Sequence, residues 1–205
     1  MKPMVLHSVI VSYQRPELLK ETIDSYLATV TLPHQLMIVD NGSDKHVRDY
    51  LWDTGLPVIF LQQNHYPGYA VNIGFGNAHH AVTHLHRSDS DMRYLPGWCD
   101  EVTAAFEADC LLGQLGLRTD DEEEHSALNV GGTAILDRAV WRQGLRYDER
   151  PWKILRSVTE DYYISQEVMK RGYRWTRVKH PCVVHLASGD RRDPYYRDSY
   201  GIRGI

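Results

Sequence analysis

The stretch that decides the fold is Arg87-Ser88-Asp89-Ser90-Asp91, with Tyr94-Leu95-Pro96-Gly97-Trp98 shortly after it. It places two carboxylates one residue apart at the expected end of a strand. Hard cations such as Mg²⁺ and Mn²⁺ take oxygen ligands, and one or two carboxylates often share such an ion with the diphosphate of a substrate. The pair therefore predicts a metal-assisted nucleotide site, with a polar turn between two elements as the alternative.

Length and composition define the class of protein. The chain has 205 residues, 42% of them hydrophobic, which suits one compact domain with a core of its own. The formal net charge of -4 gives no overall basic field for nucleic acid. Cys99, Cys110 and Cys182 are odd in number and form no Cys-x-x-Cys, which argues against a disulfide framework or a zinc knuckle. With no apolar run of membrane-spanning length and no secretory leader pattern, a soluble cytoplasmic protein is expected.

Strands and helices alternate in the first part of the chain. β-branched runs, helical spacing of apolar residues and turn signals predict a strand at 5–12, a helix at 19–30, a strand at 36–39, a short helix at 47–51 and a strand at 58–61. This order predicts a mostly parallel sheet. Ligands of such sheets lie at the carboxyl ends of the strands, where Tyr13, Asp40, Asp89 and Asp91 are expected.

A further helix is expected to lead into the aspartate pair, with its buried face formed by Val71, Phe75, Ala78, Val82 and Leu85. His79, His80, His84 and His86 are then interpreted as solvated histidines of that helix. His80 and His84 have the spacing of a helical metal site, so zinc binding is the alternative. No His-Glu-x-x-His motif accompanies them, because Ala81 follows His80.

The second part of the chain is less regular. Residues 130–136 predict a buried strand in which Gly131 and Gly132 allow close backbone approach, either for substrate or simply for tight packing. A short helix is expected at 138–143. A second helix is expected to begin at Thr159-Glu160-Asp161 and to end at Gly172, and a strand is expected at 173–178. Acidic residues at a helix start also suit the helix dipole without any catalytic role. The acidic run 120–124 predicts a solvated loop.

Together these pieces resemble the GT-A glycosyltransferases of the inverting family 2 type. The resemblance rests on the order of five segments, namely Val9 to Pro16, Ile38 to Ser43, Asn64 with Gly68, Ala70, Asn72 and Gly74, Asp89 to Asp91 with Pro96-Gly97-Trp98, and Glu160-Asp161. It implies an α/β fold, a single GT-A (Rossmann-like) domain with a mostly parallel central sheet flanked by helices. That domain would span residues 1–190, with a nucleotide-sugar half at about 1–98, an acceptor half at about 99–190, and a basic and aromatic tail at 191–205.

The resemblance also implies roles for particular residues. Binding of the nucleotide sugar is implied for Ser12, Tyr13, Arg15, Asp40, Asn72 and Asp89. Asp91 would be the direct ligand of Mn²⁺ or Mg²⁺, with His185 completing the metal site and Asp89 near it. Asp161 would be the catalytic base that takes the acceptor proton, with Glu160 as second choice. The strand His84 to Ser88 departs from the family's strongly apolar pattern, and we expect it to be short or partly exposed.

The tail contains Arg191 and Arg192 among several tyrosines, and three interpretations stay open: a lid whose arginines clamp the donor diphosphate, an acceptor-binding segment, or a frayed end. The implied donor is a nucleoside-diphosphate sugar, with UDP or dTDP favoured. A saccharide is the favoured acceptor, with a lipid-linked intermediate, a protein or a hydroxylated nucleic-acid base as alternatives. The sequence indicates no oligomeric state. The rival functions are a catalytically inactive nucleotide-sugar-binding module and a metal-dependent phosphohydrolase.

Overall fold

The computed structural model describes residues 3–120, 129–149 and 160–186. The strands are β1 (Leu6–Ser12), β2 (His34–Asp40), β3 (Val58–Phe60), β4 (His84–Asp89), β5 (Met92–Tyr94), β6 (Leu112–Gly116), β7 (Ala134–Asp137), β8 (Arg174–Arg177) and β9 (Val183–His185). The helices are α1 (Pro16–Thr29), α2 (Lys45–Asp53), α3 (Tyr66–Gly76), α4 (Trp98–Ala108), α5 (Arg138–Trp141) and α6 (Glu160–Lys170). The predictions for Thr159, for 121–124 and for the tail with Arg191 and Arg192 lie outside the described residues.

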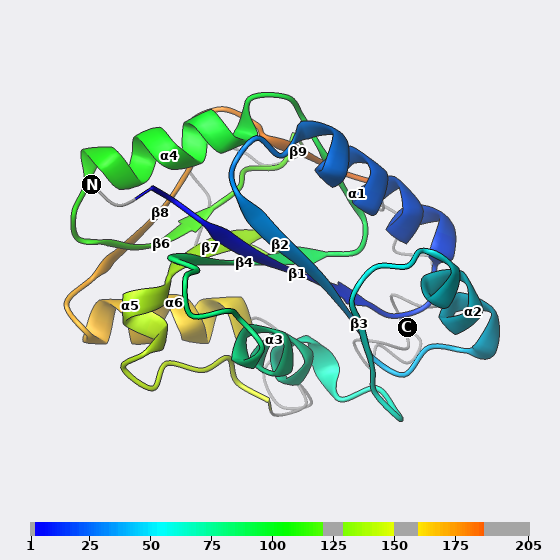
Figure 1. Ribbon diagram of the computed structural model, residues 1–205. Helices are drawn as coiled ribbons and strands as arrows, with labels where there is room; N and C mark the ends of the chain where they lie inside the picture. The colour runs from blue at the N-terminus through cyan, green and yellow to red at the C-terminus, as the bar shows by residue number, and fades with distance from the viewer. Residues whose placement is uncertain (1–2, 121–128, 150–159, 187–205) are drawn as a thin grey trace, which may run out of the picture.

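The centre of the molecule is a seven-stranded sheet in the order β3-β2-β1-β4-β7-β6-β8. Neighbouring strands run parallel except where β7 pairs antiparallel with β4 and β6. α1 and α4 cover one face and α3, α5 and α6 the other (Figure 1). A small second sheet pairs β5 with β9 in antiparallel fashion. The expected fold, a single α/β domain with a mostly parallel sheet between helices, is confirmed.

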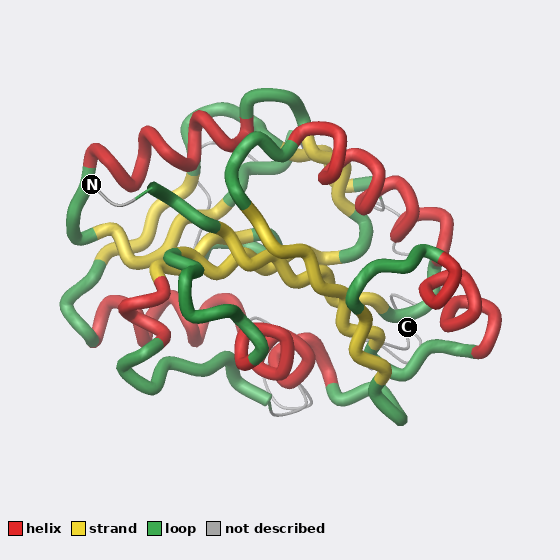
Figure 2. The backbone as a smooth tube through the Cα atoms, viewed as in Figure 1, coloured by secondary structure: helices red, strands yellow, loops and turns green. Residues whose placement is uncertain are grey.

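Two hydrophobic cores lie on opposite faces of this sheet, between it and the helices that Figure 2 shows on either side. Alternation along β1 feeds both, because successive side chains of a strand point to opposite faces. Leu6 and Ile10 enter the core under α1 and α4, whereas Val9 and Val11 enter the core under α3, α5 and α6. β1 is thus buried on both faces, which is the pattern expected of a central parallel strand.

The structure corrects the helix that was expected to reach Leu85. α3 ends at Gly76, and Leu85 belongs to β4, the central strand between β1 and β7. The apolar spacing runs on from α3 into β4 because both elements bury residues on the same face of the sheet. The spacing therefore resembled that of one continuous helix. The interpretation of His80 and His84 as one turn of a helix is wrong as well, since His84 begins β4. Among the residues described, no group of three or more acidic, histidine or cysteine side chains forms a metal cluster.

The expectation that the strand before the aspartates is short or partly exposed is also wrong. β4 has six residues, and its interior is buried despite its polar sequence. His86 is fully buried, with Nδ1 2.9 Å from the hydroxyl of Ser8 and Nε2 3.0 Å from the hydroxyl of Tyr94. Burial lowers the pKa of His86 to about 3, so the ring is neutral. Hydrogen bonds of this kind to neighbouring elements make a polar central strand tolerable, because a buried polar group with a partner costs far less than one without.

The later part of the chain adds elements that the sequence pattern did not separate. β5, α4 and β6 follow the aspartate pair, and the strand expected at 130–136 begins only at Ala134. Gly131 lies in the preceding turn with a φ of 78°, which explains the later start. Within the three described ranges, no helix is long and apolar enough to span a bilayer.

Candidate active site

The candidate site lies at the carboxyl ends of β1, β2 and β4, as the alternation of strands and helices predicts. β1 ends at Ser12, β2 at Asp40 and β4 at Asp89, and these strands are neighbours in the sheet. Ser12 and Asp40 face each other in the register of the β1–β2 pair. The sheet therefore brings residues from distant parts of the chain to one edge.

Two buried oxygens at this edge have no hydrogen-bond partner within the described part of the chain, Oγ of Ser12 and Oδ1 of Asp40. An unpaired buried acceptor costs about 1–3 kcal/mol, and such groups in native proteins call for an explanation. Oδ2 of Asp40 accepts a hydrogen bond of 3.2 Å from the backbone N–H of Ser43. Burial raises the pKa of Asp40, and the bonds from Ser43 oppose that rise. Tyr13, which follows Ser12, is half-buried.

The loop from β1 to α1 is held in an unusual backbone conformation. Gln14 and Arg15 have φ values of 57° and 52°, in the left-handed region that non-glycine residues rarely enter. The backbone N–H of Gln14 donates to Oγ of Ser43 at 2.9 Å, which ties this loop to the one after β2. The conformation directs Arg15 to Asp91, and its Nη2 lies 3.1 Å from Oδ2 of Asp91. Strained positions of this kind concentrate at functional sites.

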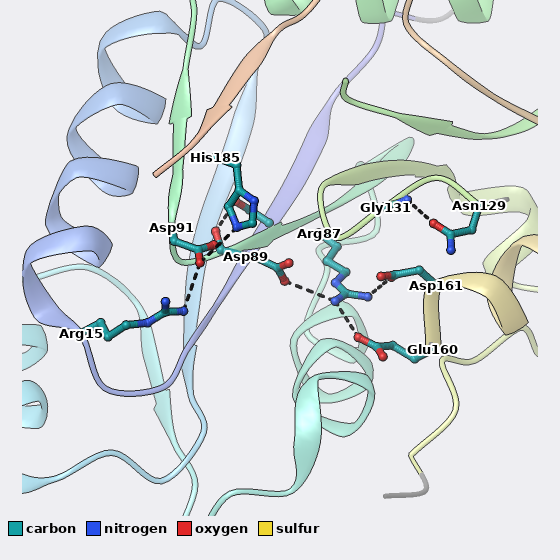
Figure 3. Close-up of polar contacts among 10 residues, drawn as sticks. Arg15, Arg87, Asp89, Asp91, Asn129, Gly131, Glu160, Asp161 and His185 are labelled. Carbon is teal, nitrogen blue, oxygen red and sulfur yellow. Dashed lines mark hydrogen bonds and ion pairs between the residues drawn. The ribbon is translucent and has the colours of Figure 1, made fainter. Parts of the chain in front are cut away.

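Asp91 also meets His185, the predicted second metal ligand. The pairing of β5 with β9 sets Met92 opposite His185, and Nε2 of His185 lies 3.4 Å from Oδ2 of Asp91 (Figure 3). Burial works against ionisation of Asp91, but His185 and the charge of Arg15 outweigh it and lower its pKa. An ionised carboxylate beside an imidazole is a donor set that Mn²⁺ accepts, with further positions left for phosphate oxygens. The residues present therefore fit the implied metal.

A second charged cluster surrounds Arg87, next to the first in Figure 3. The Arg87 guanidinium donates to Oδ1 of Asp89 at 3.2 Å, to Oε1 of Glu160 at 2.8 Å and to Oδ1 of Asp161. The Arg87 side chain is 2% exposed, against 33% for Asp89, 5% for Glu160 and 11% for Asp161. The predicted base Asp161 is thus brought together with the first aspartate of the pair through an arginine.

The pKa values in this second cluster reflect burial against charge pairing. Burial raises the pKa of Asp161, and the guanidinium of Arg87 opposes that rise without cancelling it. Asp89 behaves in the same way, with its pKa raised by burial and opposed by Arg87. A carboxylate whose pKa lies above its usual range is a stronger base once ionised, which suits proton abstraction near neutral pH.

The two glycines before β7 have different surroundings. A Cβ at Gly132 would overlap Oδ2 of Asp89, so the absence of a side chain there is what lets the carboxylate approach. The N–H of Gly131 donates to Oδ1 of Asn129 at 2.8 Å. Of the two interpretations of these glycines, close packing describes Gly132, and the group packed against it is a predicted site residue.

Asn72, expected to bind the donor, has its side chain occupied by protein groups. Its Nδ2 donates to the carbonyl of Tyr147 at 2.9 Å and to Oε1 of Glu149 at 2.7 Å, and its Oδ1 accepts from the Tyr147 N–H at 2.9 Å. The ring of Tyr147 lies under Arg87, with Cζ of Arg87 5.3 Å from the ring centroid. Asn72 thus supports the second cluster from α3.

Arg87 and Tyr147 are the site residues that the sequence reasoning missed. In the sequence, Arg87 belongs both to the polar strand 84–88 and to the stretch with the aspartate pair, and neither pattern gives it a role of its own. A charged residue two positions before the first aspartate, in a strand that the β-α-β order puts near the centre of the sheet, is the signal that could have found it. Tyr147 carries no such signal, because its contact with Arg87 depends on the loop after α5.

Solved structures of other proteins share this fold, and one protein family matches the sequence. The family model described as glycosyl transferase family 2 matches residues 8–168. Mannosyltransferase PcManGT from Pyrobaculum calidifontis, solved with GDP-Man and Mn²⁺, superposes with a TM-score of 0.72 at 15% identity over 93% of this chain. S. aureus TarS 1-349 gives a TM-score of 0.69 at 14% identity over 90% of this chain, and its complex with UDP gives 0.66 at 17% over 88%.

This chain spans 59% of the length of the mannosyltransferase, and 61% and 60% of the two TarS 1-349 chains. No curated protein matches the sequence. The family match covers most of the chain, and the matched segment contains the ends of β1, β2 and β4 together with the acids of α6. The chain belongs to glycosyl transferase family 2 and has the GT-A fold.

Proposed function

We propose that this protein is a metal-dependent inverting glycosyltransferase that moves a sugar from a nucleoside-diphosphate donor to an acceptor hydroxyl. The observation that carries the proposal is the side-by-side arrangement of two clusters at the strand ends. One cluster joins Asp91 to His185, and the other joins Asp89 to the acids of α6 through Arg87. A leaving-group site next to a buried base is what displacement at an anomeric carbon requires.

On this proposal, residues 1–98 bind the donor and residues 99–190 face the acceptor. Ser12, Tyr13 and Asp40 lie where the nucleoside would bind, and the buried unpaired Oδ1 of Asp40 supports recognition of a base N–H. Uracil, thymine and guanine all present such a group, and UDP or dTDP is our preferred donor class. The solved complexes of PcManGT with GDP-Man and of TarS with UDP support a nucleoside diphosphate of this kind.

The leaving group would be stabilised around Asp91. Asp91 and His185, with Asp89 nearby, would hold Mn²⁺ or Mg²⁺, and the bound ion would offset the negative charge that grows on the departing diphosphate. Arg15, now paired with Asp91, is placed to add a fixed positive charge there. Arg191 and Arg192, beyond the described residues, are proposed as a further clamp on the diphosphate.

Asp161 would act as the general base. Arg87 binds its Oδ1, and no hydrogen bond from the described residues reaches its Oδ2. That oxygen would take the proton of the acceptor hydroxyl as the hydroxyl oxygen attacks the anomeric carbon, while the bond to the diphosphate breaks on the opposite face. In-line attack of this kind inverts the anomeric configuration. A saccharide is the preferred acceptor, since hydroxyl groups are its main nucleophiles.

The test is donor turnover in the presence of Mn²⁺. Purified protein is incubated with UDP-glucose, UDP-N-acetylglucosamine, dTDP-glucose and GDP-mannose, with and without a panel of saccharides, and released nucleoside diphosphate and glycosylated product are measured. Asp161→Asn is expected to lower turnover by about 10²–10⁴-fold, the usual contribution of a general base. Glu107→Gln, which changes an exposed carboxylate on α4, is the matched control and should leave turnover unchanged.

The rival functions give different results. A metal-dependent phosphohydrolase would release its product without an acceptor and would be indifferent to Asp161→Asn. A catalytically inactive binding module would bind the nucleotide sugar and form no product. Full transfer by Asp161→Asn would contradict the assignment of the base.

A further inference from the structure

Arg87 is a charged side chain buried at the centre of the sheet. It lies in β4, which is flanked by β1 and β7 at the centre of the seven-stranded sheet. Its side chain is 2% exposed. Burial of an unpaired guanidinium is strongly unfavourable, so a residue of this kind persists only with carboxylate partners. The partners here are Asp89, Glu160 and Asp161.

The guanidinium of Arg87 packs against an aromatic ring in addition to binding its charged partners. Its Cζ lies 5.3 Å from the ring centroid of Tyr147. Asn72 of α3 hydrogen-bonds both backbone groups of Tyr147, which holds the backbone of Tyr147 against α3. A Cβ at Gly68 would overlap the carbonyl of Asp148, so α3 packs directly against the residue after Tyr147. The ion pairs and the ring of Tyr147 together restrict the position of the Arg87 guanidinium.

This position gives the three carboxylates a fixed relation to one another. Asp89 follows Arg87 by two residues on the same strand, whereas Glu160 and Asp161 come from the first turn of α6. Nη2 contacts Asp89 at 3.2 Å and Glu160 at 2.8 Å, while Nη1 binds Asp161 (Figure 3). One rigid, planar fork thus spans the strand end and the helix start, a task that a lysine ammonium cannot perform with the same geometry.

We propose that Arg87 is a positioning residue for sugar transfer, which orients the base Asp161 and couples its location to the donor-side carboxylate of Asp89. This inference rests on the proposed function. Arg87 bonds Asp89, Glu160 and Asp161 rather than Asp91 or His185, and it acts by holding Oδ1 of Asp161 so that Oδ2 faces the acceptor. Loss of Arg87 would leave three carboxylates without their common counter-charge, and they would separate or take up protons.

A double-mutant cycle on kcat tests the inference. The variants are Arg87→Met, Arg87→Lys, Asp161→Asn and the combination of Arg87→Met with Asp161→Asn. The assay uses whichever of the four nucleotide sugars above the unaltered protein turns over. Arg87→Met is expected to lower kcat by about 100-fold, the size of effect that follows from a displaced catalytic group, and to change the KM for the donor much less than kcat. Arg87→Lys should restore part of the loss, because it keeps the charge but not the fork.

The combined variant separates positioning from general structural damage. If Arg87 acts through Asp161, adding Arg87→Met to Asp161→Asn lowers kcat no further. Independent, multiplicative losses would overturn the inference, as would an Arg87→Met protein that is folded and keeps its full kcat. If Arg87→Met does not fold, Arg87→Lys takes its place in the same cycle. Arg174→Met is the control, since Arg174 pairs with Asp109 on the exposed surface at 2.5 Å.

The outcomes also distinguish this inference from the proposed function. Turnover by no donor in the unaltered protein contradicts the function, and the inference with it. Turnover that is lost in Asp161→Asn but survives in Arg87→Met contradicts the inference alone. Far-UV circular dichroism and thermal unfolding of every variant show which proteins are folded.

Discussion

The backbone of Gly132 lies directly against the carboxylate of Asp89, with no room for a side chain between them. This contact joins the turn before β7 to the end of β4. Oδ1 of Asp89 is bound by Arg87, so the carboxylate is confined from two sides. The first aspartate of the pair is therefore held towards the second cluster, and Asp91 serves the first cluster with Arg15 and His185.

Gly132→Ala is expected to displace Asp89 and to lower kcat by at least about 10-fold, since misplacement of a site residue by 1 Å can cost about 100-fold. Steady-state turnover with a nucleotide sugar measures the effect. Gly76→Ala is the matched control: apart from the adjoining backbone of its own helix, no atom lies within 4 Å of a Cβ built at Gly76, so its turnover should not change. Equal activity in the two alanine variants would show that the Gly132–Asp89 contact has no part in transfer.

Asp91→Asn is expected to weaken nucleotide binding only when metal is present. The substitution removes the anionic ligand that His185 and Arg15 keep ionised by lowering its pKa. Calorimetric titration with UDP and Mn²⁺ should give a Kd raised by at least about 10-fold, which corresponds to about 1.4 kcal/mol. In chelator, the variant and the unaltered protein should bind alike. A variant whose Mn²⁺-dependent affinity is unchanged would exclude Asp91 as a ligand.

Transfer should depend on pH in the direction set by Asp161. The base acts in its ionised form, and burial raises the pKa of Asp161 above the ordinary value of 3.8. Activity should therefore fall as the pH is lowered, and the fall should begin at a higher pH than an exposed aspartate would give. A profile of kcat against pH in saturating donor checks this. An acidic limb centred below pH 4 would be inconsistent with a buried base.

Asp40→Asn should separate stability from binding. The raised pKa of Asp40 means that its contribution to stability is present below its unfolded pKa and is lost as the pH rises through its folded pKa. The asparagine variant does not titrate, so at pH 7 it should melt a few degrees higher, about 2–4 °C for each 1 kcal/mol in a chain of this size. Its advantage should shrink as the pH falls towards 4.

Nucleotide affinity of Asp40→Asn should drop in the same preparation, since the carboxylate that would accept the base N–H is gone. Thermal unfolding at two pH values and calorimetric titration with UDP provide both readings. A variant that binds UDP normally would remove Asp40 from the nucleotide site, and a lower Tm at pH 7 would contradict the unfavourable burial of its charge.

Much of the fold follows from local sequence. β1 and β2 are runs of β-branched and apolar residues that end in polar turns, so their carboxyl ends were predictable, and with them the positions of Tyr13 and Asp40. The start of α6 at Glu160 was predictable from its acids and the apolar spacing that follows. The contact of Asp91 with His185 came from the family resemblance rather than from local pattern, because β5 and β9 are short strands far apart in the chain.

The incorrect predictions about the helix that reaches Leu85 and about the exposure of the next strand both concern β4. Its polar residues make sense only beside their partners, since His86 is bonded to Ser8 and Tyr94, and Arg87 to three carboxylates. Except for Asp89, which is two residues from Arg87, these partners come from other elements of the fold. A rule based on local sequence predicts that a strand of this composition is exposed or helical. The tertiary contacts of its polar side chains determine instead that it is a buried strand.

The most direct test of the central claim is a calorimetric titration of the purified protein with UDP, dTDP, GDP and CDP, each in Mn²⁺ and again in chelator. We expect one of these nucleoside diphosphates, UDP or dTDP in the first place, to bind in Mn²⁺ and to lose most of its affinity in chelator. A folded protein that binds none of the four under either condition would contradict the assignment of a nucleotide-sugar site to the ends of β1, β2 and β4.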